Sequence, residues 1–141
     1  TSSICSGVLP RLRELAIKTG KELGIKIHDK GTVVVINGPR FSTKSESKFF
    51  TSQGWEVINM TAFPEAYLVK EMDMCPLNIS LITDYDAGLV GDVPPVSHHE
   101  VIQVFNNNVE NLKHLLFTMI EKLPDERENC DCKNTKAKSR V

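Results

Sequence analysis

The 141-residue sequence has no long apolar run and almost no net charge. No stretch approaches the roughly 20 consecutive apolar residues of a membrane-spanning helix, and no basic segment followed by an apolar one opens the chain. The formal net charge of −1 provides no electrostatic attraction to nucleic acid or to an anionic membrane. We therefore expect a cytoplasmic protein whose partners include neither nucleic acid nor membrane.

Cysteine is also scarce, with four residues at Cys5, Cys75, Cys130 and Cys132. A secreted domain held together by disulfides would usually contain more. Cys5 and Cys75 lie among apolar residues, where a buried thiol is expected. Cys130 and Cys132 lie in a polar segment that reads as exposed, and this pair could form a reducible disulfide or half of a metal site. Because no matching His or Cys cluster accompanies the pair, we favour a redox or packing role and expect no metal.

What the sequence does contain is typical of a soluble globular domain, since 40% of its residues are hydrophobic and 25% charged. Apolar periodicity and Gly or Pro boundaries such as Gly54 predict alternating elements, and capping boxes begin two of the helices, Thr43 with Glu46 and Ser97 with Glu100. The predicted helices cover residues 10–23, 43–54, 64–72 and 97–123, and the predicted strands cover residues 32–37, 56–60 and 77–83. This order indicates an α/β fold, a layered mixed β-sheet flanked by helices. We expect residues 1–123 to form this partial domain and residues 124–141 to form a mobile polar tail.

Polar and aromatic residues follow each predicted strand. Ligands of open α/β sheets bind where the strands end, so these residues are candidates for a site. Thr61 precedes a helix and could contact a phosphate or simply cap the helix. Asp84 and Asp86 lie two residues apart, so on an extended segment both would face one ligand; the alternative is a turn built on their side chains. Phe41 could stack on a flat ligand or belong to the core.

Four segments occur in an order that is specific to one family. They read VVVINGPRFSTKSES, GWEVINMTAFPEAYLVKE, SLITDYDAG and VSHHEVI. Together they resemble the C-terminal half of the methylthioadenosine-cleaving members of the purine nucleoside phosphorylase family, over residues 9–120. Such enzymes cleave the purine–ribose bond of a nucleoside with inorganic phosphate as co-substrate. The resemblance implies a pentosyltransferase of purine salvage without a cofactor.

The resemblance also implies roles for individual residues. Asp84 and Asp86 match the acidic pair that reads the base, with Asp86 as the acid at the purine N7. Ser42 and His98 fall at positions that influence which purine or 5′ substituent is accepted. The remaining implied contacts are Phe41 with the purine ring, Met60 with the ribose, Thr61 with phosphate, and Val96, Val101 and Ile102 with the 5′ group.

The sequence TDYD, rather than TDYN, points to adenine nucleosides. A carboxylate accepts a hydrogen bond from the 6-amino group of adenine, whereas an amide can donate to a 6-oxo group. The expected reaction converts 5′-methylthioadenosine, or also adenosine, to adenine and the sugar 1-phosphate. The alternatives are a general purine nucleoside phosphorylase, a non-catalytic ligand-binding or assembly module, and a thiol-redox module.

The family's other phosphate-binding motifs lie in the N-terminal half, and nothing in this sequence matches them. We therefore expect activity only together with that N-terminal half. The opening Thr1-Ser2-Ser3 suggests that more sequence precedes it. The resemblance further implies a homo-oligomer, either a trimer or a dimer of trimers.

Overall fold

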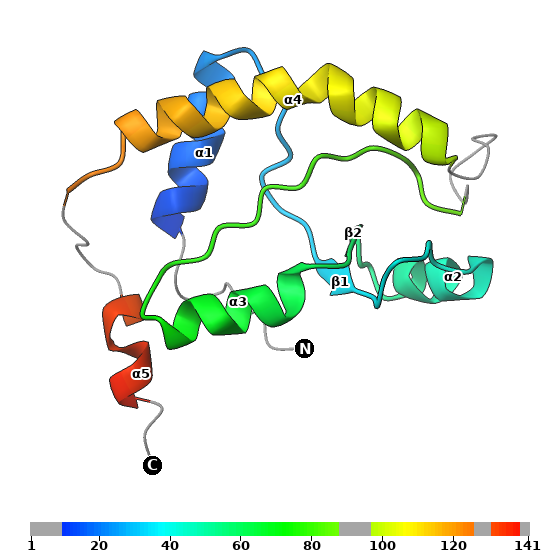
Figure 1. Ribbon diagram of the computed structural model, residues 1–141, viewed down its shortest axis with the longest axis horizontal. Helices are drawn as coiled ribbons and strands as arrows, with labels where there is room; N and C mark the ends of the chain where they lie inside the picture. The colour runs from blue at the N-terminus through cyan, green and yellow to red at the C-terminus, as the bar shows by residue number, and fades with distance from the viewer. Residues whose placement is uncertain (1–9, 88–96, 126–130, 139–141) are drawn as a thin grey trace. The chain divides into compact units, whose positions relative to one another are not determined.

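The computed structural model describes residues 10–87, 97–125 and 131–138. Its elements, shown in Figure 1, are α1 (Pro10–Glu22), β1 (Val33–Val35), α2 (Lys44–Ser52), β2 (Val57–Asn59), α3 (Ala62–Glu71), α4 (His98–Glu121), the 3₁₀ helix η1 (Asp131–Asn134) and α5 (Thr135–Lys138). The alternation of helix and strand confirms the predicted α/β class. Within the described residues, no helix has both the length and the apolar character needed to cross a membrane.

The chain divides into two compact units. Unit 1 comprises residues 1–29, 61–79 and 113–141, and unit 2 comprises residues 30–60 and 80–112. The long helix α4 begins in unit 2 and ends in unit 1. The boundary at residue 123, between a partial domain and a polar tail, stays a prediction.

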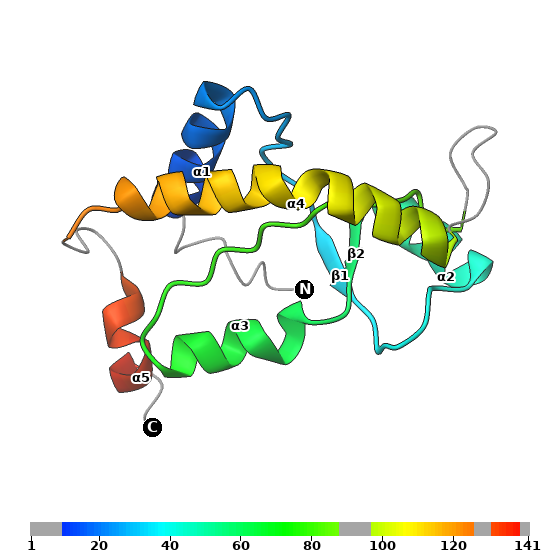
Figure 2. The same ribbon diagram turned by 45° about the horizontal axis from the view of Figure 1, so that its top comes forward.

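Unit 2 contains a parallel strand pair, which is seen most clearly in Figure 2. Val33 pairs with Val57 and Val35 with Asn59, and the Ile36 N–H extends the ladder to the Asn59 carbonyl at 3.0 Å. Parallel strands need a crossover connection, and α2 provides it. The helix begins after the predicted cap Thr43, and the chain turns at Gly54, whose φ of 69° is in the left-handed region that favours glycine.

Aromatic side chains link the end of α2 to the start of β2. Phe50 is buried, and its ring stacks on Trp55 with the centroids 6.0 Å apart. The Trp55 N–H also donates to the Phe50 carbonyl at 3.1 Å. These contacts fix the return of the chain from helix to strand.

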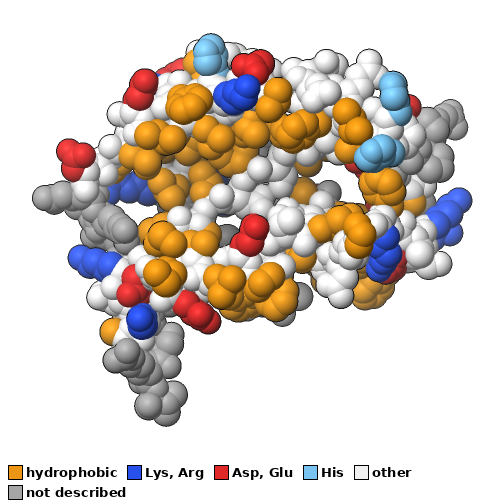
Figure 3. Space-filling view, viewed as in Figure 1, with side chains coloured by type: hydrophobic (Ala, Val, Ile, Leu, Met, Phe, Trp, Pro, Cys, Tyr) orange, Lys and Arg blue, Asp and Glu red, His pale blue; other side chains and the backbone are white. Residues whose placement is uncertain are grey.

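Unit 1 is built around α1 and the last part of α4. Ala16, Leu115 and Met119 form a buried cluster, and the partly buried residues packed against it are Leu15, Ile25, Ile27, Leu77 and Ile79. Hydrophobic side chains also remain exposed along α3 (Figure 3), namely Phe63, Tyr67, Leu68 and Met72. No residue of α3 is buried, which is typical of a helix that packs against further protein.

The prediction of a third strand over residues 77–83 is wrong. These residues form irregular chain, and the described sheet contains β1 and β2 alone. A strand depends on a neighbour that supplies ladder hydrogen bonds, and neither described strand pairs with this segment. Both β1 and β2 are also shorter than predicted, and their residues are half-buried.

The prediction of a mobile polar tail is wrong for residues 131–138. They form η1 and α5, and α5 contacts α3. The Lys136 N–H donates to Asp73 Oδ1 at 2.9 Å, and Cys132 is fully buried. The exposed position predicted for Cys132 is therefore also wrong, because the segment that contains it folds into helical turns and α5 contacts α3. Cys5 and Cys130 lie outside the described residues.

Candidate functional site

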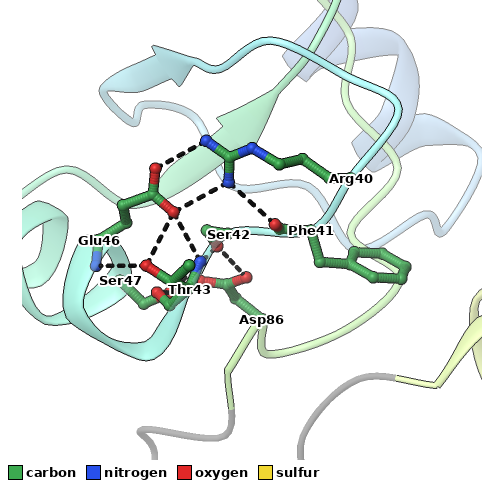
Figure 4. Close-up of polar contacts among 7 residues, drawn as sticks. All are labelled: Arg40, Phe41, Ser42, Thr43, Glu46, Ser47 and Asp86. Carbon is green, nitrogen blue, oxygen red and sulfur yellow. Dashed lines mark hydrogen bonds and ion pairs between the residues drawn. The ribbon is translucent and has the colours of Figure 1, made fainter.

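The turn after β1 is held to the first turn of α2 by an arginine (Figure 4). Arg40 donates from Nη2 to Glu46 Oε1 at 2.7 Å and from Nη1 to Oε2 at 2.9 Å. Its Nη1 also donates to the Phe41 carbonyl at 3.0 Å. A bidentate arginine–carboxylate pair fixes geometry as well as charge. The GPRFS turn therefore has a defined conformation relative to α2.

Glu46 also completes the predicted capping box. Its carboxylate accepts from the Thr43 N–H at 2.7 Å, and the Glu46 N–H donates to the Thr43 hydroxyl oxygen at 3.2 Å. The hydrogen bond from Arg40, followed by those from Thr43, lowers the pKa of Glu46 from 4.5 to about 2. Hydrogen bonds to the charged form favour ionisation, so Glu46 stays ionised at neutral pH.

Asp86 is held between two serine hydroxyls that belong to this same turn and helix. Ser42 donates to Asp86 Oδ1 and Ser47 donates to Oδ2 (Figure 4). The two serine Oγ atoms lie 3.1 Å apart. The structure thus brings the predicted residues Ser42 and Asp86 into direct contact, although 44 positions separate them in the sequence.

Ser47 was not predicted as a site residue. A serine between Glu46 and Lys48 in a polar helix reads as exposed, yet the residue is only 4% exposed. The available signal was its position five residues after Ser42, which places it one helical turn beyond the cap and next to the GPRFS turn.

Asp84 builds a turn rather than an extended segment. Its Oδ1 accepts the Asp86 N–H at 2.8 Å, and its Oδ2 accepts the Thr83 hydroxyl at 2.7 Å. Asp86 has a φ of 53°, a left-handed conformation that Asp tolerates better than most residues. Of the two alternatives, the turn built on an Asp side chain is therefore confirmed, and the extended segment is wrong.

Phe41 and Met60 both remain accessible in unit 2. Phe41 is 46% exposed and its ring points away from the hydrogen-bonded cluster in Figure 4, so the alternative of a core phenylalanine is wrong. Met60 is 39% exposed, and its Sδ lies 2.9 Å from where a Cβ on Gly38 would stand. Gly38 therefore makes room for Met60 beside the GPRFS turn.

Thr61 stands at the N-cap of α3, but its side chain makes no capping hydrogen bond. The alternative reading of an ordinary capping hydroxyl is therefore wrong. Phe63 interrupts the first turn with φ −113° and ψ 129°, so the regular helix runs from Pro64, as predicted. Thr61 belongs to unit 1, and its contact with phosphate stays a prediction.

Two of the residues expected around the 5′ group, Val101 and Ile102, lie on the first turns of α4. Ser97 caps this helix as predicted, accepting the Glu100 N–H at 3.3 Å. His98 and Ile102 are exposed and Val101 is half-buried, whereas Val96 lies outside the described residues. Their contacts with a ligand stay predictions.

The family model for the phosphorylase superfamily matches residues 6–121. S-methyl-5′-thioadenosine phosphorylase of Thermofilum pendens is 45% identical over 130 residues, which are 92% of this chain and 48% of the relative. A protein of Dictyoglomus turgidum named as a probable 6-oxopurine nucleoside phosphorylase is 42% identical, over 89% of this chain and 46% of that protein.

Among solved structures, a variant of adenosine/methylthioadenosine phosphorylase from Schistosoma mansoni in complex with adenine superimposes with a TM-score of 0.86. It is 25% identical, and the match covers 98% of this chain and 55% of that one. The chain thus spans about half the length of the curated relatives it matches. The family predicted from the motifs is confirmed, and this chain belongs to the phosphorylase superfamily.

Proposed function

We propose that this chain provides the base-binding part of an enzyme that cleaves 5′-methylthioadenosine with inorganic phosphate. The products are adenine and 5-methylthioribose 1-phosphate. The observation that carries the proposal is the Asp86 carboxylate, which accepts hydrogen bonds from Ser42, in the turn that also presents Phe41, and from Ser47, in α2. The name of the Thermofilum pendens relative and the adenine in the Schistosoma mansoni structure support this choice of substrate.

The chemistry requires a group that stabilises the departing purine. Cleavage of a glycosidic bond builds positive charge on the sugar and negative charge on the base. Asp86 shares a proton with the purine N7, and Asp84 faces the 6-amino group. Each carboxylate offers about four lone-pair positions. Asp84 accepts one hydrogen bond on each oxygen, from the Thr83 hydroxyl and the Asp86 N–H. Asp86 likewise accepts one on each oxygen, from Ser42 and Ser47. Both carboxylates can therefore accept further hydrogen bonds from a base.

The other predicted residues take the roles that the resemblance implies. Phe41 stacks on the purine, Met60 covers the ribose, and Thr61 binds phosphate at the start of α3, since the N-terminus of a helix favours an anion. Ser42 and His98 tune the choice of substrate. The 5′ group is received by Val96, Val101 and Ile102.

The proposed enzyme contains more protein than this chain. Enzymes of this family use phosphate as a co-substrate, and one threonine at one helix end is too small a set of donors to hold it. We expect the N-terminal half of the same enzyme to supply the other phosphate ligands, in a cytoplasmic trimer or dimer of trimers that needs no cofactor. Residues 1–123 then form the C-terminal half of the catalytic domain. The exposed apolar side chains of α3 support contact with that N-terminal half.

A hybrid enzyme tests this function. In it, this chain replaces the matching 130 residues of the Thermofilum pendens relative. We expect the hybrid to release adenine from methylthioadenosine only when phosphate is present, and faster than it releases hypoxanthine from inosine. The unmodified relative is the control for assembly.

A second candidate is a 6-oxopurine nucleoside phosphorylase, favoured by the name of the Dictyoglomus turgidum relative. Faster turnover of inosine than of methylthioadenosine by the hybrid would establish this candidate and overturn the first. A folded hybrid that released no base from either nucleoside would instead indicate a non-catalytic module.

A further inference from the structure

We propose that Ser47 is a positioning residue for Asp86, and that rotation of its hydroxyl supports both the ionised and the protonated carboxyl group. This inference rests on the proposed function, in which Asp86 exchanges a proton with the purine. Ser47 is almost fully buried, so water has little access to replace its hydroxyl. It lies in the first half of α2, where the capping box and the Arg40–Glu46 pair fix the helix start.

The hydroxyl of Ser47 has two acceptors within reach. One is Asp86 Oδ2, and the other is the Thr43 carbonyl oxygen at 3.1 Å. The Ser42 Oγ, 3.1 Å away, is a further neighbour that can donate or accept. A serine hydroxyl has one hydrogen and two lone pairs, so it can donate to only one of these groups at a time.

With Asp86 ionised, Ser42 and Ser47 both donate to the carboxylate. The Thr43 carbonyl then keeps its backbone hydrogen bond from the Ser47 N–H, at 3.0 Å. No buried acceptor is therefore left without a donor when the hydroxyl turns toward Asp86, which avoids the cost of an unsatisfied polar group.

With Asp86 protonated and no purine bound, its single hydrogen can point from Oδ2 to the Ser47 Oγ, and it turns to N7 when the purine binds. Ser47 then donates to the Thr43 carbonyl, while Ser42 still donates to Oδ1. Every hydrogen again has an acceptor. The nearby charged groups are Asp84, in the same turn as Asp86, and the Arg40–Glu46 pair on the α2 side. Ser47 thus provides a partner for Asp86 before and after proton transfer, without movement of the backbone.

A purely structural role for Ser47 is the alternative. Serine within a helix often bonds the carbonyl four residues earlier, and the contact with Thr43 has this form. Replacement of Ser47 would then change stability alone. The two roles differ in what they predict for the chemical step.

Kinetics of the hybrid enzyme separate them. We expect Ser47→Ala to lower kcat for methylthioadenosine by about tenfold to 100-fold, less than the loss of an acid–base group itself, with KM changed by less than about threefold. Ser47→Thr keeps a hydroxyl and should restore most of kcat. Ser45→Ala, an exposed serine of the same helix, is the matched control and should behave as wild type.

A double-mutant cycle tests whether Ser47 acts through Asp86. In an Asp86→Ala background, Ser47→Ala should lower kcat no further, because the group it positions is gone. A full additional loss in that background, or an unchanged kcat for Ser47→Ala alone, would overturn the inference.

Amide hydrogen exchange of the chain itself provides a readout that does not depend on activity. The Asp86 N–H donates to Asp84 within the turn at 2.8 Å. We expect exchange of this N–H to accelerate about tenfold in Ser47→Ala but not in Ser45→Ala. The exchange rate depends on the free energy of local opening, which the contacts of Asp86 with Ser47 should raise. If the wild-type hybrid is inactive while this difference appears, the proposed function fails and the positioning role stands. Equal exchange in both variants contradicts the positioning role whatever the hybrid does.

Discussion

At the scale of single residues, Asp86 has the most consequential chemistry of the described chain. Both of its oxygens accept from serine hydroxyls, and its backbone is held by Asp84. Serine hydroxyls can accept as well as donate, so Ser42 and Ser47 can bind an amide as well as a carboxylate. Asn can therefore replace Asp86 without loss of the turn.

We predict that Asp86→Asn shifts the base preference of the hybrid enzyme. The kcat/KM for methylthioadenosine should fall by about 100-fold or more, because an amide cannot serve as the acid at N7. The kcat/KM for inosine should fall less, since the amide can donate to the 6-oxo group. Equal losses for both nucleosides would show that residue 86 does not determine the base preference.

A second residue-scale prediction concerns Thr19. Its side chain is fully buried, and its hydroxyl oxygen has no hydrogen-bond partner. Thr19→Val keeps the shape and removes an unsatisfied polar group, which should raise the free energy of unfolding by about 1 kcal/mol. Denaturant unfolding measures this change, with the exposed Lys18→Ala as control. A loss of stability would mean that the hydroxyl has a partner in solution.

At the scale of secondary-structure elements, α2 shows what local sequence can determine. Its cap, its capping box and its terminal glycine are adjacent in the chain, and all three were predicted. The segment 77–83 shows the limit: its apolar composition suits a strand, but pairing depends on residues far away in the sequence. The contact of Ser47 with Asp86, 39 residues apart, could not be predicted for the same reason.

The start of α2 should be sensitive to acid. The pKa of Glu46 is lowered to about 2 by hydrogen bonds from Arg40 and Thr43. Since the folded-state pKa is below the unfolded value of 4.5, Glu46 stabilises the fold above that value and loses this contribution as the pH falls toward 2.

Glu46→Gln tests this acid sensitivity. The thermal unfolding midpoint of wild type should exceed that of the variant at neutral pH, and the difference should vanish near pH 2. A difference that stayed constant with pH would exclude the charge of Glu46 as its origin. Added salt should screen the Arg40–Glu46 ion pair and so reduce the difference in unfolding midpoint at neutral pH.

Packing between elements gives another prediction, at Gly20. A Cβ at this position would lie 2.0 Å from Ile27 Cδ1 and 3.8 Å from Leu115 Cδ1. Gly20→Ala gains up to about 1 kcal/mol in helix propensity, but overpacking typically costs about 1–3 kcal/mol. We expect a net loss of stability in denaturant unfolding, whereas the exposed Lys21→Ala should be nearly neutral. A more stable Gly20→Ala variant would contradict the packing described here.

At the scale of the whole molecule, the family was evident from the order of its motifs, because GPRFS, NMT and TDYD come from three distant segments. The placement of each site residue was less predictable. Burial of Cys132 and the short helix α5 depend on packing within unit 1, which a polar composition does not reveal. Residues whose roles depend on the remainder of the enzyme, above all Thr61, can be assigned only when that remainder is present.

We propose above all that this chain binds adenine as part of a phosphorylase that cleaves methylthioadenosine. The most direct measurement compares phosphate-dependent base release from methylthioadenosine and from inosine by the hybrid with Thermofilum pendens. We expect faster release of adenine, no release without phosphate, and a shift of the preference toward inosine in Asp86→Asn. Faster release of hypoxanthine by the unmodified hybrid would contradict it.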